Sequence, residues 1–214
     1  MMKCLHDLPV AGWMHNPWVS DALATGQWRD AYHAPPRFFL RLIASAANER
    51  PDLQGLLRSV SGFITARLNA FDDGPESFTH TDLHFRNVIV NGGHVTGLID
   101  FEGSRVGPRD VELDMLVRSI ASENGGAGSR YPGTVATLRN VYPELFSHPH
   151  LVTRLEVSEA LWHLVQLHHW KAGDSWTSDP REALTLLIAG DLRERVGRLL
   201  DEGLASRPQS SESR

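Results

Sequence analysis

The sequence is poor in cysteine, lysine and long apolar runs. Its single cysteine, Cys4, excludes a disulfide framework and any cysteine-rich zinc or iron–sulfur site. No apolar segment reaches the ~18 residues that a membrane span needs, and residues 1–7 lack the apolar core of a signal peptide. Asp and Glu (26) outnumber Lys and Arg (21), so no basic excess indicates a nucleic-acid or membrane partner. We therefore expect a cytoplasmic protein with neither partner.

Most apolar residues recur at the spacing of amphipathic helices, as in a globular domain. The spacing predicts two helices over 38–71, joined at 48–51, and a long helix over 151–168. A further helix starts at Asp179-Pro180, where Asp as N-cap, Pro at N1 and Glu182 form a capping-box pattern, and continues to Leu199.

The remaining stretches predict connections. Residues 9–36 are loop-rich, residues 123–133 are a flexible connection and residues 205–214 are a flexible tail. The boundaries favour one domain over residues 1–204.

The middle of the chain changes from helical to β character. Residues 87–90 and 95–100 are rich in β-branched residues and flank Asn91-Gly92-Gly93-His94, which predicts a β hairpin. Gly107-Pro108 then predicts the first turn of a helix that continues to about Ser122. The fold class expected is α+β, predominantly α-helical, with one small hairpin.

Polar residues gather on both sides of this hairpin. A hairpin returns its second strand beside its first, so Asn87 at the entrance and Asp100 at the exit are expected to lie close together, with Asp82 facing the same point. Asn and Asp oxygens suit Mg²⁺, which binds one or two protein ligands together with phosphate oxygens. Asp82 is left to accept a proton from an attacking hydroxyl. This is the arrangement of a phosphoryl-transfer site.

The motifs resemble those of the aminoglycoside phosphotransferase/choline kinase family, small-molecule kinases of the protein-kinase-like fold. The resemblance covers residues 78–118 and rests on His80-Thr81-Asp82-Leu83-His84, Asn87, and Leu98-Ile99-Asp100-Phe101-Glu102, with Phe85-Arg86 where the family usually has Pro-Gly. Leu5-His6-Asp7-Leu8-Pro9 is similar to a segment that follows the ATP-binding lobe in that family.

The resemblance implies a role for each matching residue. Asp82 corresponds to the catalytic base, His80 to the His that organises the catalytic loop, and His84 to the residue that replaces the protein-kinase Lys. Asn87 and Asp100 correspond to the magnesium ligands and Asp114 to a buried helical Asp that braces the loop. The implied reaction transfers a phosphoryl group from ATP or GTP to a hydroxyl of a small molecule; aminoglycosides, other antibiotics, choline-like alcohols and sugars occur as acceptors among relatives.

The sequence does not match the ATP-binding lobe of that family. It has no G-x-G-x-x-G and no G-x-x-x-x-G-K, and neither lysine, Lys3 nor Lys171, lies where the strand Lys belongs. The chain thus resembles a kinase C-lobe. Three explanations stay open: a coding sequence that starts upstream of Met1, a degenerate relative that only binds a ligand or partner, or an oligomer or partner chain that completes the nucleotide site.

Other interpretations compete at single residues. His80, Asp82 and His84 alternate and suit a zinc site with Asp100; Asp82 and Asn87 also occur in ordinary turns. Asp110, Glu112 and Asp114 are also compatible with a solvated acidic face of a helix. His163 and His168 suit either a packed core position or one that faces the acceptor. Glu102 suits either a surface turn or a position near the metal.

Overall fold

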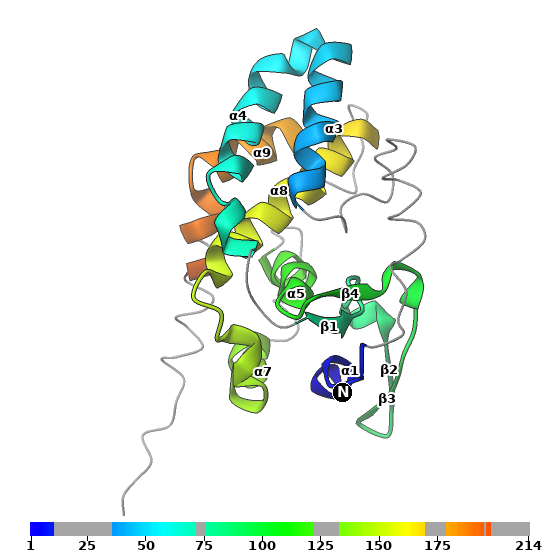
Figure 1. The fold of residues 1–214 in the computed structure, drawn as a ribbon. Coiled ribbons are helices and arrows are strands. Elements are labelled where there is room, and N and C mark those ends of the chain that lie inside the picture. The colour runs from blue at the N-terminus through cyan, green and yellow to red at the C-terminus, as the bar shows by residue number, and fades with distance from the viewer. Residues whose placement is uncertain (11–35, 72–75, 122–132, 170–178, 195, 198–214) are drawn as a thin grey trace, which may run out of the picture.

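The structure is a computed structural model that describes residues 1–10, 36–71, 76–121, 133–169, 179–194 and 196–197. Its described part is mostly helical, with two short antiparallel sheets (Figure 1). The loop-rich stretch, the flexible connection and the tail expected at 9–36, 123–133 and 205–214 lie largely or wholly outside the described residues. Within them, no helix is long and apolar enough to cross a membrane.

The helices expected from the apolar spacing are present. α3 (Pro36–Glu49) and α4 (Gln54–Thr65) form an antiparallel pair joined by a short 3-10 turn at Pro51–Leu53. α8 (Leu151–His169) and α9 (Pro180–Ile188) pack beside them (Figure 1). The apolar side chains predicted to lie inward are buried, among them Phe39, Ile43, Leu57, Val60 and Leu164.

α9 ends earlier than the apolar spacing predicts. The helix ends at Ile188, and Gly190 adopts φ +99°, a left-handed conformation that interrupts the helical backbone. Helical residues resume at Asp191, and Leu192 and Val196 still reach the core. The prediction of one continuous helix to Leu199 is therefore wrong, although its buried face is right.

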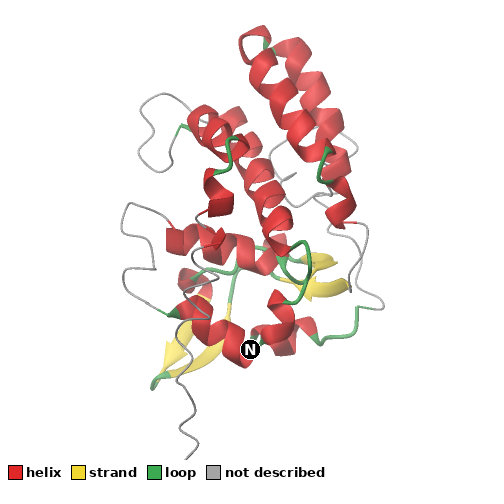
Figure 2. Ribbon diagram, turned by 90° about the vertical axis from the view of Figure 1, so that its left-hand side faces the viewer, coloured by secondary structure: helices red, strands yellow, loops and turns green. Residues whose placement is uncertain are grey.

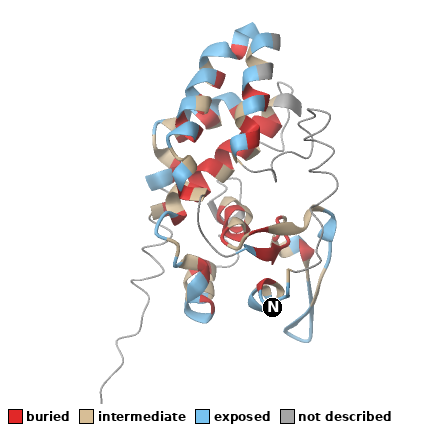
Figure 3. Cartoon of the chain, in the orientation of Figure 1, coloured by how far each residue is buried: buried red, intermediate tan, exposed pale blue. Residues whose placement is uncertain are grey.

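Figure 3 shows α8 largely in the colour of buried residues, and its buried residues include the charged Arg154, Glu156 and Glu159. Arg154 forms an ion pair with Asp110 (Nε–Oδ2, 3.0 Å), and Glu156 accepts two hydrogen bonds from Arg193 (2.9 and 2.6 Å). Burial of a charge is tolerated because each has a partner of opposite sign. α8 is thus a central helix to which α5 and the segment after α9 are attached by ion pairs.

The described residues form two separate sheets, one of which is the hairpin that the sequence predicts (Figure 2). The predicted hairpin is present as β2 (Val88–Asn91) and β3 (His94–Leu98), with Gly92 and Gly93 at positive φ in the turn between them. The second sheet pairs β1 (Glu76–Thr79) with β4 (Arg105–Pro108) in antiparallel register.

The β1–β4 sheet corrects the prediction that Gly107-Pro108 starts a helix. Pro108 is the last residue of β4, where a missing N–H is tolerated, and α5 (Val111–Ala121) begins three residues later. α1 (Met2–His6) lies against β1, and α7 (Thr134–Val141) leads to a 3-10 turn at Pro143–Phe146. The two sheets and α5 flank the loop of residues 80–87, which carries the predicted base Asp82.

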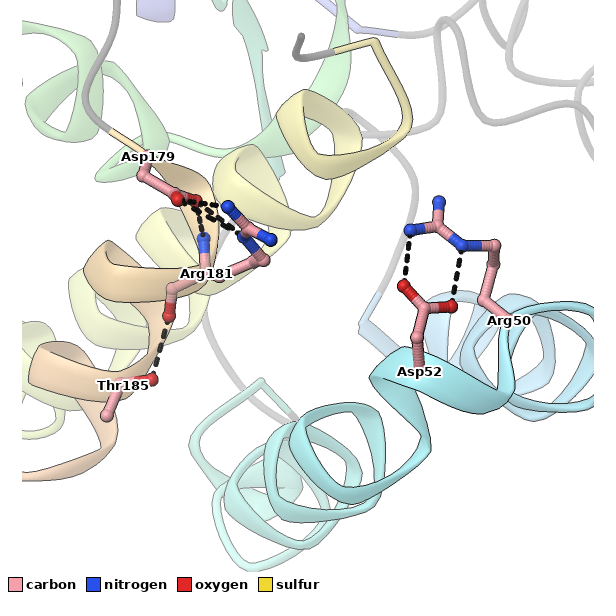
Figure 4. Close-up of polar contacts among 5 residues, drawn as sticks. All are labelled: Arg50, Asp52, Asp179, Arg181 and Thr185. Carbon is pink, nitrogen blue, oxygen red and sulfur yellow. Dashed lines mark hydrogen bonds and ion pairs between the residues drawn. The ribbon is translucent and has the colours of Figure 1, made fainter. Parts of the chain in front are cut away.

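Two similar ion pairs allow helix capping to be tested (Figure 4). One joins Arg50 and Asp52 between α3 and α4, and the other joins Asp179 and Arg181 at the start of α9. Asp179 binds the Arg181 guanidinium and also accepts a hydrogen bond from the Arg181 backbone N–H (2.9 Å), so it is a true N-cap. Asp52 binds the Arg50 guanidinium but caps no helix through its side chain.

We expect Asp179→Ala to lower the free energy of unfolding by about 1 kcal/mol, because it leaves an N-terminal N–H of α9 without a partner. Asp52→Ala is the control and should change stability less. The hydrogen bond from Arg181 lowers the pKa of Asp179, so its contribution is present above the ordinary aspartate value of about 4 and is lost as the pH falls through the lowered pKa. Urea denaturation of both variants at pH 7 and at low pH measures this; equal losses at pH 7 would contradict the capping role.

Candidate active site

His80 is the buried residue at which the catalytic segment enters the site. It follows β1 directly and is completely inaccessible to solvent. Its backbone N–H donates to Oε1 of Glu112 on α5, its ring Nε2–H donates to the Ile99 carbonyl (2.8 Å), and its ring packs against Phe101. A carbonyl can only accept, so the proton of His80 lies on Nε2. His80 therefore joins α5 to the residues around Asp100.

Thr81 adopts a backbone conformation that is unusual for a β-branched residue. Its φ is +67°, in the left-handed region, and its side chain is buried. The Thr81 hydroxyl donates to the Gly103 carbonyl (2.8 Å) and so ties the loop before Asp82 to the turn after Asp100. The Thr81 side chain is thus buried, whereas that of the next residue, Asp82, is partly exposed.

Asp82, His84 and Asn87 lie together, as the sequence predicts. The Asn87 Nδ2 donates to the Asp82 backbone carbonyl (3.0 Å) and to Asp82 Oδ2 (3.2 Å). His84 Nε2 lies 3.6 Å from the same Oδ2. His84 Nδ1 accepts from the Arg86 N–H (3.2 Å), so Nε2 carries the ring proton on the side of Asp82. Asn87 thus binds Oδ2 of the partly exposed Asp82 carboxylate, whereas Asp82 Oδ1 forms no side-chain hydrogen bond within the described residues.

The backbone places Asp100 beside the segment that leads into β2. The Ile99 N–H donates to the Asn87 carbonyl (3.1 Å), which extends the β2–β3 pairing by one step and puts Asp100 next to the start of β2. Asp100 also has a left-handed backbone (φ +67°), is exposed, and forms no side-chain hydrogen bond within the described residues. Asp adopts the left-handed region more readily than most residues, and in this conformation the carboxylate is accessible to solvent.

The donor set fits a hard divalent cation. Asn87 uses its amide nitrogen for Asp82, and its oxygen forms no hydrogen bond within the described part of the chain. Together with the Asp100 carboxylate, it provides the oxygen ligands that Mg²⁺ prefers. The zinc alternative is not supported, because His80 Nε2 is buried against Ile99 and no three His, Cys, Asp or Glu among the described residues are placed to hold a metal.

The carboxylate that contacts the catalytic loop is Glu112 and not Asp114. Asp114 is buried, but its carboxylate forms an ion pair with Arg118 (2.5 Å), which also lies 3.3 Å from Glu159 on α8. Desolvation, opposed by Arg118 and reinforced by Glu159, raises the pKa of Asp114 to about 7. Through Arg118, Asp114 therefore takes part in the contact between α5 and α8. The contact of α5 with the catalytic loop is made by Glu112, two residues earlier.

Two competing interpretations of the helices are settled by burial. Asp110, Glu112 and Asp114 are all buried, so a solvated acidic face is wrong. His163 is also buried and pairs with Glu159 (Nε2–Oε1, 3.1 Å), in agreement with a core position. The side chain of His168 lies outside the described residues. Glu102 is exposed in the turn after Asp100.

Sequence reasoning missed Glu112, Thr81 and the role of the β1–β4 sheet. Glu112 stands between Val111 and Leu113, and an acidic residue flanked by apolar residues at a helix start was a usable signal. The conformation of Thr81 has no such signal, because a β-branched residue does not indicate positive φ.

We expect Thr81→Ala to destabilise the protein by about 1 kcal/mol more than Thr81→Gly, the reverse of the usual order of these residues. Both lose the hydrogen bond to Gly103, but only Ala retains a Cβ in the left-handed backbone. Chemical denaturation of the two variants measures the difference, and an equally stable or more stable Ala variant would show that the backbone at Thr81 is not strained.

The raised pKa of Asp114 predicts that stability falls as the pH rises. A carboxyl that holds its proton more tightly in the folded chain than in the unfolded one stabilises the fold at low pH, and this is lost between about pH 4 and about pH 7. We expect Asp114→Asn to reduce this loss, as followed by urea denaturation at several pH values. Asp52→Asn is the control, because the Arg50 guanidinium lowers the pKa of Asp52 below that window. An unchanged pH dependence in Asp114→Asn would contradict the assignment.

Comparison with known proteins identifies the family of the chain. Residues 5–145, about two thirds of the chain, match the family described as Phosphotransferase enzyme family (APH). No curated protein and no solved structure matches the chain significantly. The match covers the last two residues of α1, the pair α3–α4, both sheets, α5 and α7, and it confirms the resemblance drawn from the motifs. The chain belongs to the phosphotransferase enzyme family.

Proposed function

We propose that this chain transfers a phosphoryl group from ATP or GTP to a hydroxyl of a small molecule, with antibiotics among the candidate acceptors. The observation that carries the proposal is the Asp82 carboxylate, of which one oxygen is hydrogen-bonded to Asn87 and the other is not. Asn87 binds one of its oxygens at 3.2 Å, and the Asn87–Ile99 backbone hydrogen bond brings Asp100 alongside. Positioning and charge stabilisation supply most of the catalysis in phosphoryl transfer, and these residues provide both.

Asp82 is the base in this proposal. Its Oδ2 is directed by Asn87 and His84, which leaves Oδ1 to accept the proton of the acceptor hydroxyl. The acceptor oxygen forms a bond to phosphorus as the bond between phosphorus and the nucleotide oxygen breaks, and the nucleoside diphosphate leaves. His84 Nε2–H lies on the Asp82 side, 3.6 Å from Oδ2, and helps to keep that oxygen turned away from the acceptor.

Asn87 and Asp100 are the residues that would hold Mg²⁺. The ion supplies neutralisation of the phosphate charges when it is bound. Asp100 contributes a full negative charge from an exposed position, whereas Asn87 contributes a neutral oxygen and keeps Asp82 in place. Substitution of Asp100 should therefore affect metal binding alone, whereas substitution of Asn87 should also disturb the position of Asp82.

A non-catalytic binding protein is the second candidate. The observation that favours it is the structure before the site: within the described residues up to Thr79, Glu76–Thr79 is the one strand, and α1, α3 and α4 are helices. No glycine-rich phosphate loop occurs in the sequence. Such a protein would keep a ligand in the same place without transferring phosphate.

Titration of the chain with ATP and with GTP, with and without Mg²⁺, tests the proposal by calorimetry and thermal shift. We expect magnesium-dependent binding that Asp100→Asn weakens about 10- to 100-fold while the fold is preserved. Asp82→Asn should bind the nucleotide and lower phosphoryl transfer by about 10²–10⁴-fold. Asp52→Asn, an exposed carboxylate of the α3–α4 connection, is the control and should match the wild type.

The outcomes separate the two functions. Nucleotide binding without transfer to any hydroxyl compound, and without an effect of Asp82→Asn, would favour the binding protein. Absence of nucleotide binding in the wild type would overturn the phosphotransferase proposal for this chain. Binding that Asp100→Asn leaves unchanged would show that the metal ligands are assigned incorrectly.

A further inference from the structure

A buried chain of polar contacts joins the N-terminal helix α1 to the catalytic segment. Tyr142 OH lies 2.9 Å from His6 Nδ1, and His6 Nε2 lies 3.6 Å from Glu112 Oε1, the oxygen that accepts the His80 N–H. The side chains of His6 and Glu112 are both completely buried. Residues more than one hundred positions apart in sequence therefore meet at the carboxylate that braces the catalytic loop.

The direction of each hydrogen bond follows from its donors. Arg109 Nη1 donates to the Tyr142 oxygen (3.5 Å), so the Tyr142 hydroxyl proton is free to be donated to His6 Nδ1. Burial raises the pKa of Tyr142, which keeps that proton on the hydroxyl. His6 then carries its own proton on Nε2, the nitrogen that faces Glu112. Every donor is thus directed along the chain toward Glu112.

Glu112 depends on these donors because it has few others. The His80 N–H donates to Oε1, and His6 Nε2 lies 3.6 Å from the same oxygen, slightly beyond hydrogen-bond distance. Neither His6 Nε2 nor Glu112 Oε2 has a hydrogen-bond partner among the described residues. A buried carboxylate with one satisfied oxygen is costly, so any donor that fixes its rotamer has a large effect on its position.

We propose that His6 is a positioning residue of the phosphotransferase site: its Nε2–H holds Glu112 in the rotamer that binds the His80 N–H, and Tyr142 sets its tautomer. His6 touches neither substrate nor metal and acts through Glu112 and His80 on Asp82 and Asp100. The effect of His6 on catalysis rests on the proposed function, whereas the contact between His6 and Glu112 does not.

Two conservative variants separate the two nitrogens of His6. In His6→Gln the amide nitrogen reaches the place of Nε2, so the contact with Glu112 is kept and that with Tyr142 is lost. In His6→Asn the amide oxygen reaches the place of Nδ1 and accepts from the Tyr142 hydroxyl, so the contact with Tyr142 is kept and that with Glu112 is lost. Both variants place an amide in the same buried site, so a purely structural role predicts similar effects for the two.

The first readout is the backbone amide of His80, observed by NMR in the whole protein without nucleotide. We expect the low-field proton resonance and slow hydrogen exchange of a charge-assisted bond in the wild type and in His6→Gln. In His6→Asn the resonance should move upfield, and exchange should accelerate by about tenfold or more. Lys3→Ala, which removes the exposed ion pair of the same helix with Glu144, should leave this amide unchanged.

The second readout is the split between kcat and KM. His6→Asn should lower kcat by about 10- to 100-fold with KM for the magnesium nucleotide unchanged, and His6→Gln should restore kcat. An His80 amide that is identical in the two variants would overturn the inference, whatever the activity. A wild type without transferase activity would instead overturn the proposed function, and the amide comparison would still decide whether His6 positions Glu112.

Discussion

The contact between the buried Glu112 carboxylate and the backbone of His80 is the interaction on which the geometry of the site depends. It fixes the first residue after β1 against α5, and His80 in turn holds the Ile99 carbonyl, the neighbour of Asp100. Burying an ionised carboxylate is unfavourable unless donors surround it. Because the contact spans two segments that are adjacent in neither sequence nor sheet, the catalytic loop has a defined position only when α5 is packed.

α5 is held by charges rather than by apolar contacts alone. Asp110 pairs with Arg154, and Arg118 with both Asp114 and Glu159, so three carboxylates of two helices share two guanidinium groups at the α5–α8 interface. Removing one member of such a set leaves the others buried without compensation, whereas an apolar contact can adjust by repacking. The interface therefore fixes one orientation of α5, and with it the direction in which Glu112 points.

Local patterns predicted the elements that depend on neighbours in sequence. The Gly92-Gly93 turn, the Asp179 cap and the antiparallel pair α3–α4 follow from residues within one or two turns of each other. The pairing of β1 with β4 joins residues about thirty positions apart, and Pro108 alone is compatible with both a helix start and a strand end. The role of Glu112 depends on this pairing, so it could not be chosen over Asp114 from spacing alone. Asp82, His84 and Asn87 could be chosen, because five residues and a 3-10 turn bring them together.

The contact of His6 with Tyr142 has a consequence for the order in which the chain folds. α1 leaves the ribosome early, but the hydroxyl that orients its histidine is made 136 residues later. At usual rates of synthesis, this interval lasts about ten seconds or longer. During it, the first helix has no partner at that nitrogen, whereas β1, the hairpin and α5 are already complete. Tyr142 and α8 are therefore both made after the catalytic segment, so the contacts that orient His6 and fix α5 form only once most of the chain has been synthesised.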